Sequence, residues 1–375
     1  IGLAAWRIGQ YEEATQIAHE ALELKRRNGL EDQLARSYNN LGLLAFAQNR
    51  FTESLEWYGL ADSVARSRGE EKLVFAVMDN VANSMIELAK FADARQRQRR
   101  LEARDFMSAA GPRLEGNALI NLGMLEIRLG NPQGGMESLR EAIERHREID
   151  YQTGVAYALR WVGTAYSAQG QSSAALATLD SALVLFEEQG LRAEKASVYE
   201  NMAYVYAGAG DFQRAIELYD RAQVINAELG LDLETGIDLR GEADIHLRLG
   251  DYLRARDLAT EALMLHQRVG APLEEMLDVL LLAEVSDLRE EPADVEVFIS
   301  KARQLADALD APIARVELAL AQARIHDRHR RSSATLEELD RVSVDLSLGG
   351  HSAEWEAAFL RSRAYLRLGE LESAT

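Results

Sequence analysis

A small residue recurs about every 40 positions along the whole chain. It is found at Gly2, Gly42, Ala82, Gly123, Gly163, Ala203, Ala243, Ala283, Ala323 and Ser362, and consecutive members are 39 to 41 residues apart. Repetition at a fixed period of this size indicates an array in which each unit packs only on its neighbours. A chain of 375 residues would otherwise be expected to divide into separate cores. The period therefore predicts one continuous solenoid.

A second small residue follows the first by twelve positions. It is found at Ala14, Ser54, Ala94, Gly135, Ala175, Ala215, Ala255 and Ala374, whereas Val295 and Thr335 take its place in two units. This spacing predicts two antiparallel helices joined by a tight turn, with both small residues where the helix axes approach to about 8–10 Å. A larger side chain there would overpack the crossing, at a cost of about 1–3 kcal/mol.

Turn residues separate the predicted helices. Glycine followed by a polar residue occurs within the units, at Gly9-Gln10, Gly130-Asn131, Gly170-Gln171, Gly210-Asp211 and Gly250-Asp251. Such pairs supply a left-handed residue after one helix and a capping side chain before the next. The second helices are expected to end at Gly29, Gly69, Gly190, Gly230 and Gly270, and Pro112, Pro272 and Pro312 lie near the starts of first helices.

The unit around Ala203 resembles the tetratricopeptide repeat. It reads Tyr199-x2-Met202-Ala203-x2-Tyr206 and then Ala215-x3-Tyr219, with Ala222 following, against the family signature W-x2-L-G-x2-Y, A-x3-F and P. The period of about 40 exceeds the usual 34 residues, and is similar to long repeats of LGN/Pins-type scaffolds and of arrays in CHAT-associated and MalT-like bacterial proteins. The resemblance implies an all-α, right-handed superhelical solenoid of antiparallel helix pairs that binds a protein or peptide in its concave groove.

We expect residues 1–375 to form this single solenoid. The proposed units are 1–34 (partial), 35–74, 75–115, 116–155, 156–195, 196–235, 236–275, 276–315 (degenerate), 316–354 (degenerate) and 355–375 (partial). In the degenerate units, Glu290-Glu291-Pro292 and Arg330-Arg331 replace the glycine turn. Looser helix packing and a change of superhelix curvature are expected near residues 285–345.

Composition narrows the possible functions. The chain has no cysteine, which excludes disulfides and thiolate sites and favours a cytoplasmic location. Its most apolar stretch, residues 276–285, contains two carboxylates and is shorter than the roughly 18–20 residues of a membrane span, so no membrane partner is expected. The net charge is −19 and no basic stripe recurs at the repeat spacing, which argues against nucleic acid.

One basic run departs from this acidic character. It comprises Arg95, Arg97, Arg99 and Arg100, with Arg104 after it. The run could be read as a nucleic-acid contact, but family resemblance puts it on the convex side. An exposed face or a contact to a domain outside this chain is preferred, and the run could also help the chain meet an acidic partner.

No catalytic motif is present. The sequence lacks HExxH, GxSxG and a phosphate-binding glycine loop, so neither catalysis nor a cofactor is expected. His326 and His329 are the only histidines spaced to share a metal. They lie among arginines that would repel a cation, and a solvated turn is the preferred interpretation.

The first helices carry the candidate ligand contacts. When the first small residue is numbered position 8, a rotation of about 100° per residue places positions 4, 7, 8 and 11 in the core and positions 2, 5, 6, 9, 12 and 13 on the other side. The candidates on that side are Asn40, Asn80, Asn121, Asn201 and Trp161 at position 6, Asn83, Met124 and Tyr204 at position 9, and Arg160 and Arg240 at position 5.

The four position-6 asparagines allow two interpretations. An asparagine amide both donates and accepts, so a row of them can hold the backbone of an extended peptide, and the resemblance to LGN-type repeats favours this use. Alternatively, the amides form hydrogen bonds between helices and set the repeat spacing. The two arginines at position 5 would select acidic groups of the ligand.

We therefore predict a non-enzymatic scaffold that binds a peptide or protein segment. A second hypothesis is a regulatory sensor segment of a larger bacterial effector, such as a CHAT peptidase or a transcription regulator, with its active domain outside these residues. A third is a spacer or a module that self-associates through its repeat ends. The full reading frame on either side would distinguish the second hypothesis from the first.

Overall fold

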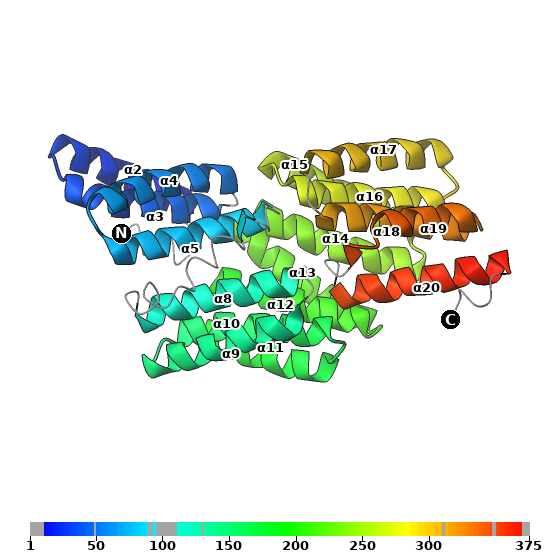
Figure 1. The fold of residues 1–375 in the computed structure, drawn as a ribbon, viewed down its shortest axis with the longest axis horizontal. Coiled ribbons are helices and arrows are strands. Elements are labelled where there is room, and N and C mark those ends of the chain that lie inside the picture. The colour runs from blue at the N-terminus through cyan, green and yellow to red at the C-terminus, as the bar shows by residue number, and fades with distance from the viewer. Residues whose placement is uncertain are drawn as a thin grey trace.

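The structure is a computed structural model, which describes residues 11–48, 50–88, 93–94, 111–129, 131–309, 312–346 and 350–369. Every regular element in these ranges is a helix (Figure 1). The helices are α2 (Tyr11–Arg27), the short 3-10 helix η1 (Glu31–Gln33), α3 (Leu34–Ala47), α4 (Phe51–Ser67), α5 (Glu71–Glu87), α8 (Pro112–Arg128), α9 (Pro132–Glu148), α10 (Gln152–Ala168), α11 (Ser172–Glu188), α12 (Arg192–Gly208), α13 (Phe212–Leu229), α14 (Asp232–Leu249), α15 (Tyr252–Val269), α16 (Pro272–Leu288), α17 (Pro292–Leu309), α18 (Pro312–Arg328), α19 (Ser332–Arg341) and α20 (Gly350–Leu368).

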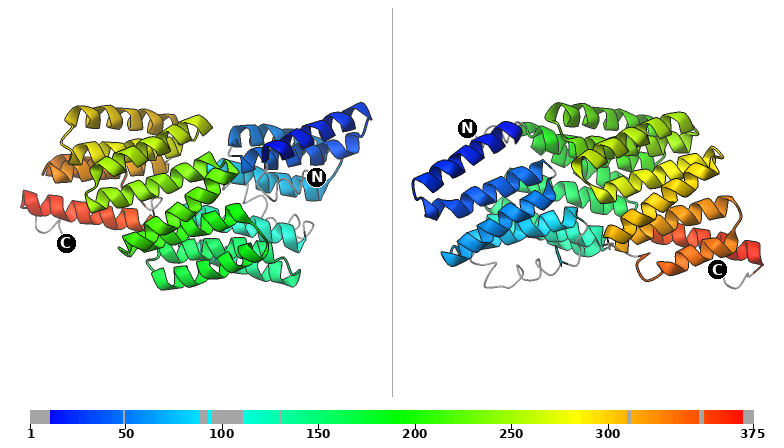
Figure 2. Two further views of the ribbon diagram at one scale, coloured as in Figure 1. Left: turned by 180° about the vertical axis from the view of Figure 1, so that it is seen from behind. Right: turned by 90° about the horizontal axis from the view of Figure 1, so that it is seen from above.

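Consecutive helices pack side by side and the pairs stack into an array (Figure 2). From α8 to α18 the first helices of the pairs begin at residues 112, 152, 192, 232, 272 and 312, an interval of 40 residues. The described chain runs from one end of the array to the other, so its two ends lie at opposite sides of Figure 1. The predicted all-α solenoid is confirmed. The proposed units 116–155 to 316–354 start four residues inside their first helices.

The small residues lie where helices cross, as predicted. A Cβ atom added to Gly135 of α9 would be 2.7 Å from the carbonyl oxygen of Gly123 on α8, and one added to Gly123 would be 2.6 Å from Cγ of Leu139. At Gly42 an added Cβ would be 2.4 Å from the ring of Tyr58. These distances leave no room for a side chain, because packed interiors already approach crystal density.

The turns of the two degenerate units have the same left-handed backbone geometry as the glycine turns, although they lack glycine. Gly210 and Gly250 both have φ 82°, and the side chains of Asp211 and Asp251 cap the helices that follow. Glu290 and Arg330 adopt the same left-handed region, with φ 60° and 57°, at a cost of about 1–2 kcal/mol per residue. The degenerate units thus retain the tight turn.

Packing in the degenerate units is nevertheless reduced on the second helices. Helix α19 has only 10 residues, and α17 buries only Ala302 and Ala306. In both helices the second small residue is replaced, by Val295 and Thr335. The expected change of curvature near this region stays a prediction.

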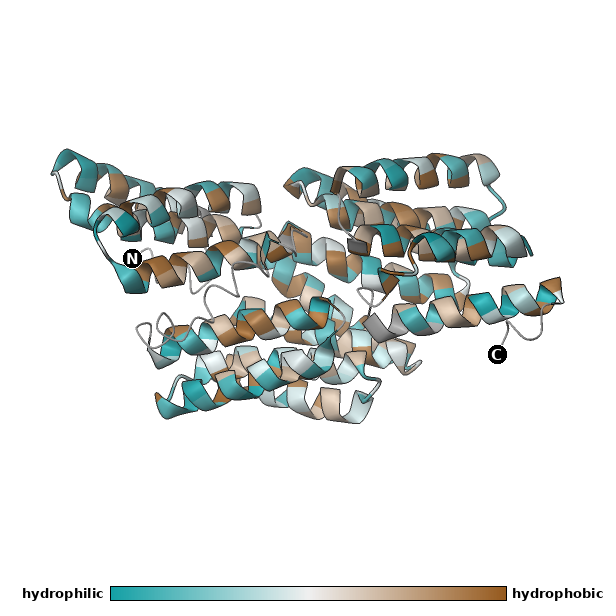
Figure 3. Cartoon of the chain, in the orientation of Figure 1, coloured by the Kyte–Doolittle hydropathy of each residue, from teal (hydrophilic) through white to brown (hydrophobic). Residues whose placement is uncertain are grey.

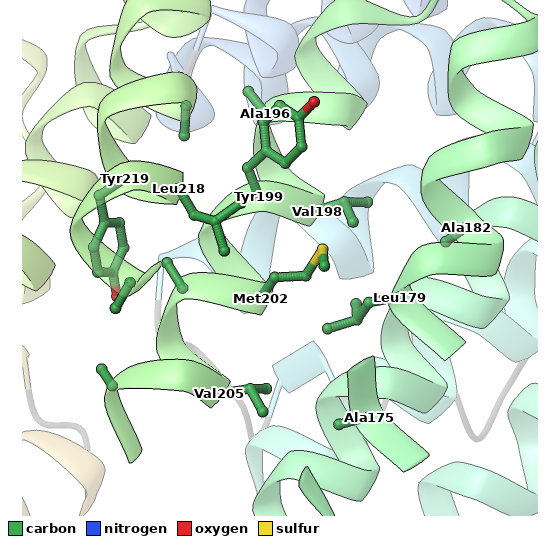
Figure 4. Packing of buried hydrophobic residues seen from close by; sticks show 14 of the residues in the cluster. Ala175, Leu179, Ala182, Ala196, Val198, Tyr199, Met202, Val205, Leu218 and Tyr219 are labelled. Atoms are coloured by element: carbon green, nitrogen blue, oxygen red, sulfur yellow. The ribbon is translucent and has the colours of Figure 1, made fainter. Parts of the chain in front are cut away.

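Clusters of buried apolar residues follow one another along the array. The largest cluster joins residues of α10 to α14, and Leu179 and Val198 are fully buried in it (Figure 4). Apolar and polar residues alternate along the helices of the array (Figure 3). Within the described ranges no helix has the length and apolar character required to cross a membrane.

Candidate ligand-binding surface

The first helices curve around a common inner surface. Helix α20 contacts α10 although nine helices separate them in the chain. Burial and Arg240 act most strongly on the pKa of Glu274 on α16, and Arg128 on α8 adds a smaller lowering effect. We use the term inner surface for the face that extends from α10 to α18. It comprises Tyr157, Arg160, Trp161, Glu200, Asn201, Tyr204, Arg240, Asp244, Glu284, Glu317 and Arg324.

The position-6 asparagines contact the preceding unit. Asn80 Nδ2 donates to Oδ1 of Asn39 at 3.0 Å, and Asn201 Oδ1 accepts a longer bond of 3.5 Å from Arg160. Both partners occupy position 5 of the unit before. These bonds support the inter-helix interpretation for part of the row, although each amide retains further hydrogen-bonding capacity. Asn40 is exposed and Asn121 is half-buried.

Met124 was expected on the ligand-facing side, and this expectation is wrong. Its side chain is buried, with 4% of its surface exposed, in a cluster with Ile86, Ala94 and Leu125. Ile120 is at position 5 of the same unit, which the frame also places on that side, and it is buried as well. The reason is that a helix in a solenoid packs against its neighbours on both sides, so position 9 of this unit faces the preceding unit.

Arg240 lies at position 5 as predicted, but the protein itself supplies its anions. Its guanidinium forms ion pairs with Glu274 at 2.5 Å and with Asp278 at 3.3 Å. Asp278 is fully buried and also contacts Nδ1 of His266 at 2.5 Å. Burial acts to raise the pKa of Glu274, but Arg240 more than offsets this and holds that pKa below its usual range. The charge of Arg240 is therefore balanced by carboxylates of the same chain.

Arg160 differs from Arg240 because it forms no ion pair within the described part of the chain. Its Nε is buried without a hydrogen-bond partner, and burial lowers the pKa of its guanidinium. The guanidinium lies over the ring of Trp161, 4.8 Å from the ring centroid. The structure thus brings together Arg160, Trp161 and Asn201, three of the predicted ligand residues.

Two other predicted residues have side chains that the rest of the described chain does not fully engage. Tyr204 on α12 is 63% exposed although it is large and aromatic. Asn83 on α5 has a buried side-chain oxygen with no hydrogen-bond partner. Buried polar atoms are nearly always paired in proteins, so this unpaired oxygen is an exception.

Sequence reasoning missed the acidic residues of the inner surface. Burial raises the pKa of Glu200 to about 7, with Glu234 and Glu274 adding to the rise and Arg160 opposing it. Burial also raises the pKa of Glu317 and of Asp244. These residues occupy positions 5, 2 and 9 of the repeat frame, so the same frame could have identified them.

Ion pairs hold the last helices of the array together. Arg324 on α18 bridges Glu284 on α16, at 2.6 Å, and Glu356 on α20, at 3.0 Å. Arg367 on α20 pairs with the buried Asp327 at 2.7 Å. Near α20, the charges of the inner surface are therefore balanced by ion pairs within the chain. On α10 and α12, the guanidinium of Arg160 has no such ion pair among the described residues.

The remaining sequence hypotheses concern histidines and the basic run. Nε2 of His329 contacts Asp287 at 2.7 Å, and burial lowers the pKa of His326. No cluster of three or more metal-ligating side chains occurs in the described residues. The basic run from Arg95 to Arg104 lies outside the described residues.

Stacked helix pairs that share one frame of small residues define a helical-repeat protein of the solenoid class. Sequence profiles of the tetratricopeptide repeat match residues 1–61 and 194–268, and a second profile of the same repeat matches residues 116–149. The chain therefore contains tetratricopeptide repeats. A comparison with curated protein sequences gives no match.

Solved structures share the fold at low sequence identity. A Rap protein in complex with competence and sporulation factor matches with a TM-score of 0.68 and 13% identity, over 91% of this chain and 94% of its own. NprR in complex with its cognate peptide NprX matches with 0.57 and 15%, over 90% and 97%. Aspartyl phosphate phosphatase F from Bacillus subtilis matches with 0.55 and 15%, over 92% and 95%.

Proposed function

We propose that the chain is a binding scaffold that holds an extended segment of a peptide or protein along its inner surface. The observation that carries the proposal is the concentration of unused binding capacity there. Arg160 Nε has no hydrogen-bond partner, and the neighbouring unit presents the exposed ring of Tyr204. Aromatic and arginine side chains are the types most enriched among binding hot spots.

The repeat spacing suits an extended ligand. Adjacent first helices are separated by about 10 Å, and an extended chain advances about 3.3 Å per residue. One side chain per unit can therefore contact about every third residue of the ligand. Two structural relatives, Rap with competence and sporulation factor and NprR with NprX, are complexes with other molecules, which supports this use of the fold without identifying the ligand.

The experiment uses pools of fluorescent heptapeptides with free or amidated ends and fluorescence anisotropy as the readout. We expect at least one pool to bind the wild-type chain. Trp161→Ala and Tyr204→Ala should weaken binding at least fivefold, because both rings face the ligand. Val184→Ala, at an exposed position of α11, is the matched control and should bind like wild type. Equal loss in the control, or no binding by any pool, would refute the proposal.

A further inference from the structure

Two arginines occupy the same position of the repeat, two units apart. Arg160 and Arg240 are separated by 80 residues. The partners of Arg240 follow it by 34 and 38 residues, at Glu274 and Asp278. The equivalent residues after Arg160 are Glu194 and Val198. The site around Arg240, in which two carboxylates pair with the guanidinium, can therefore be compared with the equivalent site around Arg160.

Neither equivalent residue completes the site at Arg160. Glu194 accepts a hydrogen bond of 2.5 Å from the hydroxyl of Tyr157, and Val198 is fully buried and apolar. The residue corresponding to His266, which supports Asp278, is the buried Phe186. The carboxylate of Asp278 is thus replaced by an apolar side chain, and the carboxylate equivalent to Glu274 is bonded to Tyr157, while the arginine is kept.

Nearby Glu200 does not substitute for them. It forms no ion pair with Arg160 among the described residues, and its pKa of about 7 leaves it partly protonated at neutral pH. Burying an uncompensated guanidinium is costly. The cost is recovered when an anion arrives, since charge-assisted hydrogen bonds to a planar guanidinium are strong and geometrically specific.

We propose that Arg160 determines specificity by binding a carboxylate of the ligand, which takes the role that the carboxylates of Glu274 and Asp278 play for Arg240. This inference rests on the proposed peptide-binding function and names the chemistry of one subsite. Trp161 lies against one face of the guanidinium, whose carbon is 4.8 Å from the ring centroid, so the carboxylate of the ligand would approach in the plane of the guanidinium. The carboxylate belongs to an aspartate or glutamate side chain or to the carboxyl terminus of the peptide.

The test compares heptapeptide pools that differ in one carboxylate. Pools with aspartate fixed at each position are paired with pools carrying asparagine, and free carboxyl termini are paired with amides. We expect wild type to prefer one carboxylate-bearing partner at least tenfold, and Arg160→Met to lose that preference. Which pair shows the preference identifies side chain or terminus. A preference that is absent in wild type, or that persists in Arg160→Met, overturns the inference while leaving the proposed function intact. No binding by any pool overturns both.

A second measurement needs no ligand. Arg240→Met strands two carboxylates and should lower the midpoint of thermal unfolding by several degrees. Arg160→Met removes a cation that has no internal ion pair, so its midpoint should equal or exceed that of wild type. If Arg160→Met lowers the midpoint as much as Arg240→Met, Arg160 has an internal partner and the inference is wrong.

Discussion

Replacing Gly135 by alanine tests whether the helix crossings set the fold. The new Cβ would lie 2.7 Å from the carbonyl oxygen of Gly123 and 2.7 Å from Cγ1 of Ile127. A backbone oxygen in a packed helix can move only with that helix. Overpacking of this kind costs about 1–3 kcal/mol, and the better helix propensity of alanine returns about 0.5–1 kcal/mol. We expect a net loss of about 1–2 kcal/mol.

The matched control is Gly59→Ala, in the middle of α4. An added Cβ there meets nothing within 4 Å, so only the gain of about 0.5–1 kcal/mol applies. The assay is urea unfolding followed by circular dichroism, in which the slope m is expected to be near 3 kcal/mol/M. Gly135→Ala should lower the midpoint by about 0.3–0.7 M, and Gly59→Ala should raise it slightly. If Gly135→Ala is as stable as Gly59→Ala, glycine is not required at the crossing.

Four further predictions concern three polar residues and the shape of the particle. Asn80→Ala should lower the free energy of unfolding by about 0.5–1.5 kcal/mol through loss of its bond to Asn39, whereas Asn121→Ala should weaken peptide binding with a smaller effect on urea unfolding. Burial raises the pKa of Asp238 to about 9, above its unfolded value of about 3.9. Its stabilising contribution is therefore full below about pH 4 and declines as the pH rises toward 9. Asp238→Asn should make thermal unfolding less dependent on pH across that range, and an unchanged dependence would contradict the assignment. Small-angle scattering should give a radius of gyration well above the compact value of about 21 Å for this length, and a value near it would contradict an extended array.

The fold was predictable because its strongest constraint is local. Gly123 and Gly135 must be small for two helices to cross, and this requirement appears directly in the sequence as a period. Glu290 and Arg330 show the limit of the pattern: they break the glycine rule, yet their backbones adopt the same turn. At these two turns, helix packing holds a non-glycine residue in the left-handed region, against its local backbone preference. The sequence alone could not show this.

The binding surface was predictable only in part. A helical wheel identifies the side opposite the core, but in a solenoid that side includes contacts with adjacent units, so it misplaced Met124. It also treated Arg160 and Arg240 alike. Their difference depends on residues 34 and 38 positions later, and it became visible only when the ion pairs of one unit were compared with those of the other.

The most direct test of the account is where a bound peptide lies. The exposed Val184, Val224 and Met264 recur every 40 residues on the second helices and offer an alternative apolar row. A binding heptapeptide with a photoreactive benzoylphenylalanine at its centre can be cross-linked to the chain and the products mapped by mass spectrometry. The account predicts cross-links on α10 and α12, close to Trp161 and Tyr204. Cross-links confined to α11, α13 and α15 would show that the ligand binds the outer row and would contradict the assignment of the inner surface.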